Sequence, residues 1–286
     1  MEGIMIGQPV TIVIPCHNDG KYLLEALESA KAQTCPSVEV IIVDDHSTDS
    51  FTCSLLRKLA EQGNAVLSVP DGKRGPSAAR NVGIAAASGE YILPLDADDS
   101  IEPTYAEKAL KHMQSNPSIG ICYCKACLFG LKHGAWKLPI YSWEEILASN
   151  MIFPTAMFRK KDWETLGGYD ESLRIGLEDY AFWLRLIALG REVVQIDEYL
   201  FRYRVKQRSR TAVIAMKKEE MQAVEDVFRS CEPILSQNAL LLFKHVHRLR
   251  QEKGELTCLL SWKFFRYVFA LEWKARQLIK RFTGRA

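Results

Sequence analysis

The sequence predicts an α/β protein in which helices flank a mostly parallel β-sheet, followed by a helical C-terminal extension. In the first hundred residues, short β-branched runs alternate with segments whose apolar residues recur at helical spacing. This alternation is typical of strands joined by crossover helices, which build a covered parallel sheet. Beyond about residue 206 the pattern is helical only, so we expect one domain at residues 1–211 and a second at 212–286.

Turn and capping residues mark the change from each expected element to the next. Asn18 or Asp19 can cap the first helix, HSTDS precedes the second, and the glycine-rich GKRGPS leads into the third. A later glycine-rich turn opens a strongly apolar helix that Gly190 closes. The strands are expected at residues 10–15, 38–45, 65–70, 90–99, 119–129, 152–159 and 192–205, with further helices at 102–116 and 143–149.

Positive charge is concentrated at the C-terminal end of the chain. The net charge is +2, yet residues 259–286 hold seven basic side chains and one acid among many aromatic residues. This local excess argues against a nucleic-acid groove over the whole protein. An aromatic and basic helix suits contact with an anionic membrane surface. Packing on the α/β domain or on a second subunit is the alternative, and homo-oligomerisation remains open.

The N-terminus and the cysteines favour a cytoplasmic protein, with contact at the inner face of the membrane as an option. The first residues lack the basic stretch of a secretory signal, and no run of roughly eighteen apolar residues occurs. A disulfide framework is therefore not expected from the eight cysteines. Cys122, Cys124 and Cys127 lack a second ligand pair at zinc-site spacing, so we interpret them as small core side chains.

Acidic and polar residues follow three of the four first strands. These residues are Pro15 to Asn18, Asp44-Asp45 and Asp96-Ala97-Asp98-Asp99. Ligands of open α/β sheets gather at the carboxyl ends of the strands. Carboxylates this close repel one another and raise each other's pKa, so a cation is expected among them. Mg²⁺ and Mn²⁺ prefer such oxygen ligands together with substrate phosphates. A solvated turn that caps a helix is the alternative.

Two further segments offer groups for anion binding and for proton transfer. GKRGPSAARN places Lys73, Arg74 and Arg80 near glycines and a helix N-terminus, although Arg80 could instead pair with a surface acid. Neither a phosphate-binding loop nor a dinucleotide fingerprint is present there. Glu178 and Asp179 open the buried helix, where a carboxylate that reaches an acceptor hydroxyl acts as a general base. Helix capping alone would explain either residue.

Four segments in order and spacing resemble the family 2 glycosyltransferases of GT-A fold, over about residues 8–211. They are VTIVIPCHNDGKYLLEALESAKAQT, VEVIIVDDHSTD, GPSAARNVGIAAASGEYILPLDADD and GGYDESL…GLEDYAFWLRL. The resemblance implies a Rossmann-like, mostly parallel sheet and a metal-dependent enzyme that uses Mn²⁺ or Mg²⁺. It also implies a nucleotide-diphosphate sugar as donor, with uridine as the expected base, and inversion of the anomeric centre.

The resemblance also assigns roles to individual positions. It implies that Asp96 faces the ribose and the metal, that Asp98 is the main metal ligand of this DxD motif, and that Asp179 is the base with Glu178 beside it. Arg80 would lie by the nucleotide or the diphosphate. The base and the ribose would be held by the backbone of Pro15, Cys16 and His17 and by the side chains of Asp19 and Asp45.

The chain departs from the family pattern at two places. Lys206 stands where a histidine is common, and a protonated lysine pairs with a diphosphate but does not ligate a metal. We therefore expect phosphate binding at Lys206. The second place is His17-Asn18-Asp19. Family members more often have an aromatic residue before the asparagine and a glutamate near the position of Asp19. This difference affects the nucleotide base that we expect the protein to select.

The expected function is a glycosyltransferase that extends a surface polysaccharide or a lipid-linked glycan. A protein-directed glycosyltransferase is one alternative. A sugar nucleotidyltransferase would need a glycine-rich loop after the first strand, and PCHND is not one. A non-catalytic scaffold docked by its basic tail is a third possibility, and the retention of Asp45, Asp96, Asp98 and Asp179 argues against it.

Overall fold

The computed structural model describes residues 10–207 and 219–253. Its internal packing divides the chain into two units, one of Met1–Tyr141 with Asn150–Cys231 and one of Ser142–Ser149 with Glu232–Ala286. The domain boundary expected after residue 211 falls outside the described residues and stays a prediction. The basic and aromatic segment 259–286 also lies outside them.

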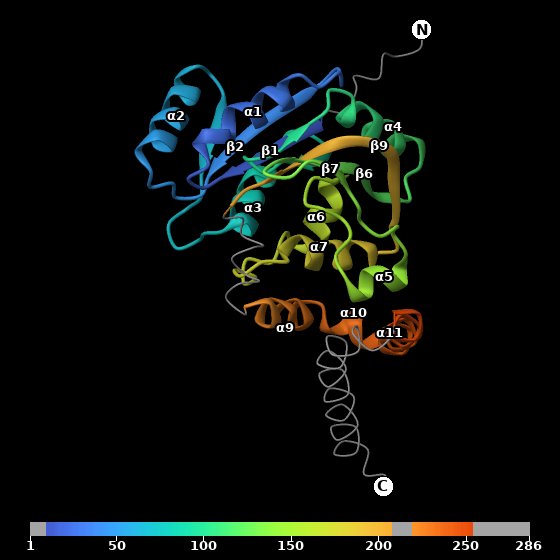
Figure 1. Cartoon of the computed structure of the whole chain (residues 1–286). Coiled ribbons are helices and arrows are strands. Elements are labelled where there is room, and N and C mark those ends of the chain that lie inside the picture. Colours follow the sequence, from blue (N-terminus) through green and yellow to red (C-terminus); the bar gives the residue numbers. More distant parts are fainter. Residues whose placement is uncertain (1–9, 208–218, 254–286) are drawn as a thin grey trace. The chain divides into compact units, whose positions relative to one another are not determined.

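The described strands of the first unit form a single curved sheet (Figure 1). Its order is β3-β2-β1-β4-β8-β6-β9-β5, and β7 pairs with β6. The strands are β1 Val10–Cys16, β2 Val38–Asp44, β3 Ala65–Ser68, β4 Tyr91–Pro94, β5 Ser100–Ile101, β6 Ile119–Gly130, β7 Gly134–Trp136, β8 Met157–Arg159 and β9 Glu192–Val205.

Helices lie along the sheet of the first unit (Figure 1), and the described part of the second unit is helical. The helices of the first unit are α1 Gly20–Lys31, α2 Ser50–Glu61, α3 Pro76–Ala86, α4 Tyr105–Ser115, α6 Lys160–Leu166, α7 Glu178–Ile187 and α9 Glu220–Ser230. Those of the second unit are α5 Trp143–Ala148, α10 Glu232–Gln237 and α11 Ala239–Lys253. Within residues 10–207 and 219–253, no helix is both long and apolar enough to cross a bilayer.

The predicted α/β class is confirmed, and most expected elements lie close to their predicted positions. Three elements were not predicted: β5, β7 and α6. The strand expected at residues 152–159 is shorter than predicted, because residues 152–156 are irregular and only Met157–Arg159 pairs in the sheet. Pro154 lies in the irregular part and has no backbone N–H to donate to a neighbouring strand.

Parallel pairing brings the polar ends of β1, β2 and β4 to the same edge of the sheet. β1 lies between β2 and β4 and is parallel to both. In this register Cys16 is opposite Asp44, and Val13 is opposite Pro94. The residues that follow these strands therefore lie next to one another, as the sequence predicted.

The cysteines of β6 are part of the core. Cys122 and Cys124 are fully buried, and burial raises the pKa of each thiol to about 12. Thiols of this kind are inert small core groups. Cys127 is half-buried at the other end of the strand.

Close packing of α3 against the sheet depends on one glycine. A Cβ at Gly83 would lie 2.4 Å from Cγ1 of Val13 and 3.0 Å from Cγ2 of Val43. Both valines are fully buried, on β1 and β2. The lack of a side chain at Gly83 therefore sets the distance between α3 and the sheet, and α3 carries Arg80 into the cavity described below.

We predict that Gly83→Ala lowers the free energy of unfolding. The overpacking penalty in a filled core is about 1–3 kcal/mol, which exceeds the gain of roughly 0.5–1 kcal/mol expected from replacing a helical glycine. Urea denaturation of the purified variant measures the difference. Ala85→Ser, at an exposed position of the same helix, is the control and should stay within about 0.5 kcal/mol of the parent. A Gly83→Ala variant as stable as this control would contradict the packing argument.

Candidate active site

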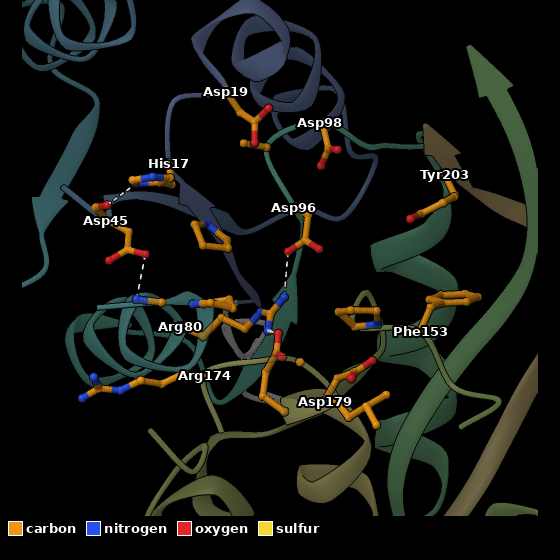
Figure 2. Close-up of a pocket in the computed structure, with 18 of the residues that line it drawn as sticks. His17, Asp19, Asp45, Arg80, Asp96, Asp98, Phe153, Arg174, Asp179 and Tyr203 are labelled. Carbon is orange, nitrogen blue, oxygen red and sulfur yellow. Dashed lines mark hydrogen bonds and ion pairs between the residues drawn. The ribbon is translucent and has the colours of Figure 1, made fainter. Parts of the chain in front are cut away.

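A cavity of about 1190 Å³ opens at the carboxyl ends of β1, β2 and β4 (Figure 2). It lies entirely within the first unit. The residues to which the resemblance assigned roles line it: Pro15, Cys16, His17, Asp19, Asp45, Arg80, Asp96, Asp98, Glu178, Asp179 and Lys206. Arg74 lines it too, whereas Lys73 is outside the lining and pairs with Glu171. Residues up to 191 positions apart in the chain are thus brought to one place. The volume is ample for a ligand larger than a typical drug molecule.

One side of the cavity is built by the ends of β1 and β2. Nδ1 of His17 donates a hydrogen bond to the backbone carbonyl oxygen of Asp45 at 2.6 Å, and Oδ2 of Asp45 accepts from the backbone N–H of Gly75 at 2.8 Å. Oδ1 of Asp45 is buried and has no hydrogen-bond partner among the described residues. Burial of an unpaired carboxylate oxygen is unfavourable, so a ligand with a hydroxyl or N–H group fits at this point.

The backbone is strained next to the candidate residues. Within the described ranges, the non-glycine residues with positive φ are Asn18, His46 and Leu177, at 56°, 55° and 62°. His46 and Leu177 line the cavity, and Asn18 lies between His17 and Asp19. Such left-handed conformations are costly and cluster at functional sites. Leu177 directly precedes Glu178, so its conformation sets the direction from which α7 begins.

Arg80 forms a buried ionic bridge at the centre of the cavity. Its Nη1 lies 2.8 Å from Oε1 of Glu178 and its Nη2 lies 2.8 Å from Oδ1 of Asp96. The arginine side chain is 2% exposed, and this burial alone would lower its pKa. The two carboxylates outweigh that effect, so the pKa of Arg80 is raised and the guanidinium stays charged. The arginine that we expected beside the nucleotide or the diphosphate thus also joins the end of β4 to the start of α7.

Lys206 lies between two carboxylates that follow β1 and β4. Its Nζ is 2.7 Å from Oδ2 of Asp98 and 2.9 Å from Oδ1 of Asp19. Partial burial would lower the pKa of the lysine, but the attraction of Asp98 and Asp19 raises it above its ordinary value. The pKa of Asp98 is raised by burial and by the charge of Asp96, although Lys206 opposes the shift.

The acidic turn is suited to a divalent cation. Asp96 and Asp98 supply hard carboxylate oxygens next to a deep cavity, and these are the ligands that Mg²⁺ and Mn²⁺ prefer. The raised pKa of Asp98 indicates that the negative charge there is not fully balanced by the protein. Asp99, by contrast, is buried and accepts from the backbone N–H of Arg204 at 2.8 Å, so it fixes the turn. No group of three or more His, Cys, Asp or Glu side chains with metal-ligand geometry occurs in the described part of the chain.

Asp179 has the properties of a general base. It is 8% exposed, and its Oδ2 accepts a hydrogen bond from Nδ2 of Asn150 at 3.0 Å. Burial and the adjacent charge of Glu178 raise its pKa to about 6, against the opposing effects of Arg80 and Asn150. A carboxyl group with this pKa is mostly ionised at neutral pH and is more basic than an exposed aspartate.

Sequence reasoning missed Asn150 and several aromatic side chains in the cavity. Asn150 is 29 residues from the aspartate that it contacts and follows a segment without any recognisable motif. Trp136, Phe153 and Tyr203 also line the cavity. Tyr203 precedes Lys206 in the FRYRVKQRSRT segment, which was the one available signal for its position.

Solved structures resemble this chain in fold, and their likeness confirms the GT-A fold. One is residues 1–349 of TarS from S. aureus in complex with UDP-GlcNAc, with a TM-score of 0.60 and 22% identity over 71% of this chain and 60% of that one. Another is the mannosyltransferase PcManGT from Pyrobaculum calidifontis in complex with GDP-Man and Mn²⁺. It has a TM-score of 0.60 and 21% identity over 96% of this chain and 81% of that one.

A model of the family described as glycosyl transferase family 2 matches residues 11–170, more than half of the chain. The protein therefore belongs to the family 2 glycosyltransferases, as the resemblance predicted. An uncharacterized glycosyltransferase of Methanocaldococcus jannaschii is 30% identical over 73% of this chain and 74% of its own length. Chondroitin synthase of Escherichia coli is 30% identical over 63% of this chain, and this chain spans only 27% of that enzyme.

We predict that Arg80→Met strongly destabilises the protein at pH 7. Removal of one partner from a buried ionic network leaves uncompensated charge and costs about 3–5 kcal/mol. The loss should be smaller at acidic pH, because a protonated carboxyl group needs no counter-charge. Urea denaturation at several pH values measures both effects. Arg74→Met, at an exposed arginine of the loop that precedes α3, is the control. Equal stabilities of the two variants would contradict the role of the bridge.

Proposed function

We propose that this glycosyltransferase transfers a sugar, with inversion, from a nucleotide-diphosphate donor to a hydroxyl group of a glycan or lipid-linked glycan. Uridine is the proposed base, and surface polysaccharide or lipid-linked glycan synthesis is the proposed context. The observation that carries the proposal is that a single cavity joins a carboxylate-lined strand edge to Asp179, a buried carboxylate with a raised pKa. The relatives support it, because their names include a chondroitin synthase and complexes with UDP-GlcNAc and GDP-Man.

The donor nucleoside is proposed to bind at the His17 and Asp45 side of the cavity. The unpaired Oδ1 of Asp45 accepts a hydrogen bond from the base or the ribose. The exposed ring of His17 and the half-buried carboxylate of Asp19 provide further contacts. The backbone of Pro15 and Cys16 lines the floor, and the Cys16 thiol takes no part in the chemistry because burial raises its pKa to about 12.

The diphosphate is proposed to lie beside Asp96, Asp98 and Lys206. Asp98 and Asp96 would hold a Mn²⁺ or Mg²⁺ ion, which when bound supplies stabilisation of the negative charge on the leaving diphosphate. Lys206 adds a positive charge beside Asp98. Its ammonium group can shift its contact from Asp98 to a phosphate oxygen when the donor binds, because the lysine donates three hydrogen bonds.

Asp179 is proposed to remove the proton from the acceptor hydroxyl. The oxygen then forms a bond to the anomeric carbon while the bond from that carbon to the diphosphate breaks, and the proton stays on Asp179. A single displacement of this kind inverts the anomeric centre. Asn150 fixes the orientation of the Asp179 carboxylate through its hydrogen bond to Oδ2, and Arg80 holds Glu178 beside it.

Membrane contact through residues 259–286 stays part of the proposal, with the enzyme at the cytoplasmic face. The seven basic side chains of this segment suit anionic lipid, and lipid-linked acceptors are presented at such a surface. A non-catalytic scaffold is not favoured, because the relatives are named as a chondroitin synthase and a glycosyltransferase, and because the cavity holds Asp179, a buried carboxylate with a raised pKa.

The rate of transfer should depend on ionisation of Asp179. Only the carboxylate accepts a proton, so kcat/KM should rise about tenfold per pH unit below pH 6 and level off above it. Asp179→Asn should lower kcat by roughly 10²–10⁴-fold while nucleotide binding persists. Initial rates of donor consumption across pH 4.5–8.5 measure this dependence. Asp197→Asn, at a surface ion pair with Lys125, is the control. An unchanged rate in Asp179→Asn would exclude this base.

Nucleotide binding should be strengthened by a divalent cation, and Asp98 should be required for that effect. We expect UDP or GDP to bind more tightly with Mn²⁺ or Mg²⁺ than with EDTA in calorimetric titrations. Asp98→Asn removes a charged ligand and should abolish the difference. Asp71→Asn, in an exposed turn, should leave it intact. If the parent protein bound neither nucleotide under any metal condition, the donor assignment would be wrong.

A further inference from the structure

Three aromatic side chains from separate parts of the chain meet in the cavity. We call Trp136, Phe153 and Tyr203 the aromatic wall. The ring centroids of Trp136 and Tyr203 are 4.7 Å apart, and those of Trp136 and Phe153 are 6.2 Å apart with nearly parallel planes. Phe201 packs behind, with its centroid 4.4 Å from that of Phe153. Such contacts fix the orientation of the rings.

The aromatic wall lies on the opposite side of the cavity from the proposed nucleoside site. Figure 2 shows Phe153 and Tyr203 across Asp96 from His17 and Asp45, with Asp179 toward Phe153. Asn150, which orients Asp179, is three residues before Phe153 in the chain. The wall and the proposed base therefore border the same part of the cavity, away from the base and the ribose of the donor.

The three rings of the aromatic wall differ in their exposure. Phe153 is 3% exposed, whereas Trp136 and Tyr203 are half-buried and line the cavity. Trp136 is the last residue of β7, a short strand that pairs only with β6 within the described part of the sheet. The hairpin thus holds a large aromatic side chain at the cavity, although an apolar core position for it would be more favourable.

A flat, rigid aromatic surface beside a hydroxyl-activating base is suited to a sugar ring. One face of a pyranose carries C–H groups of slight positive charge, and these are attracted to the negative face of an aromatic ring. Stacking leaves the hydroxyl groups at the edge of the sugar free to make polar contacts. A simple alkyl alcohol offers no such face.

We propose that the aromatic wall is the acceptor subsite and binds a sugar ring of the acceptor by stacking, with Trp136 as the main contact. This inference rests on the proposed function and specifies its acceptor as a saccharide rather than a protein or a lipid hydroxyl. The donor sugar occupies a different position, because it is attached to the diphosphate beside Asp96 and Asp98. In a displacement with inversion, the acceptor approaches from the side opposite the leaving diphosphate.

Direct binding of saccharides tests the proposal without requiring turnover. The full chain is loaded with UDP and Mn²⁺ and titrated with α- and β-linked disaccharides of glucose, galactose, mannose and N-acetylglucosamine. Calorimetry and intrinsic tryptophan fluorescence record binding. We expect at least one disaccharide to bind, Trp136→Phe to stay within about threefold of the parent, and Trp136→Leu to weaken binding about tenfold.

Trp136→Leu keeps an apolar side chain of moderate size, so it separates loss of stacking from loss of burial. Tyr199→Ala, at an exposed aromatic residue of β9 outside the cavity, is the matched control and should bind as the parent does. The UDP affinity of all variants is measured in the same samples and should be unchanged.

The possible results distinguish failure of the subsite from failure of the proposed function. Equal disaccharide affinity in the parent and in Trp136→Leu, or no disaccharide binding by a parent that binds UDP, overturns the subsite and leaves the donor assignment intact. Weaker UDP binding in Trp136→Leu would place the wall in the donor site and also overturn the inference. A parent protein that binds disaccharides but no nucleotide would contradict the proposed function. In that case, loss of disaccharide binding in Trp136→Leu would still support a saccharide site at the aromatic wall.

Discussion

The ionic bridge made by Arg80 is the interaction on which the rest of the site depends. A guanidinium that is 2% exposed can be accommodated only because carboxylates from two other elements approach it. Asp96 comes from the end of β4, and Glu178 comes from the first turn of α7. The bridge therefore fixes the proposed donor side and the proposed base side of the cavity relative to each other. Its position depends in turn on Gly83, which allows α3 to lie close to the sheet.

Charge balance in the cavity explains why neighbouring carboxylates have different properties. Glu178 is paired with Arg80. Asp179 lies beside it, and burial together with the charge of Glu178 raises the pKa of Asp179 to about 6. Asp19 and Asp98 share one lysine, and Asp98 retains a raised pKa despite it. One arginine and one lysine thus contact the four carboxylates of Asp19, Asp96, Asp98 and Glu178. The cation proposed to bind with the diphosphate would balance the remaining negative charge.

The parts of the fold that the sequence predicted are those specified by local pattern. The strands β1 to β4 have β-branched runs, and their polar ends follow directly in the chain, so the carboxylate edge was visible. The strand β5 was not, because it forms by pairing with the distant β9, and α6 and β7 were not, because seven and three residues are too few for a clear periodic pattern. The same limit applies to the site. Asn150 and Trp136 belong to it through contacts with residues 29 and 67 positions away, and no local spacing encodes such contacts.

The end of β9 is tied to the acidic turn at several points. β5 pairs Ser100 with Arg202, and the backbone N–H and Nε of Arg204 donate to Oδ1 of Asp99 and to the carbonyl oxygen of Asp98. Tyr203 of the aromatic wall and Lys206, which contacts the acidic turn, are separated by only two residues on this segment. One length of backbone therefore carries contacts for both proposed substrates. Because its hydrogen bonds hold this backbone to the acidic turn, the spacing between the proposed diphosphate contact and the proposed acceptor contact is built into the fold before either substrate binds.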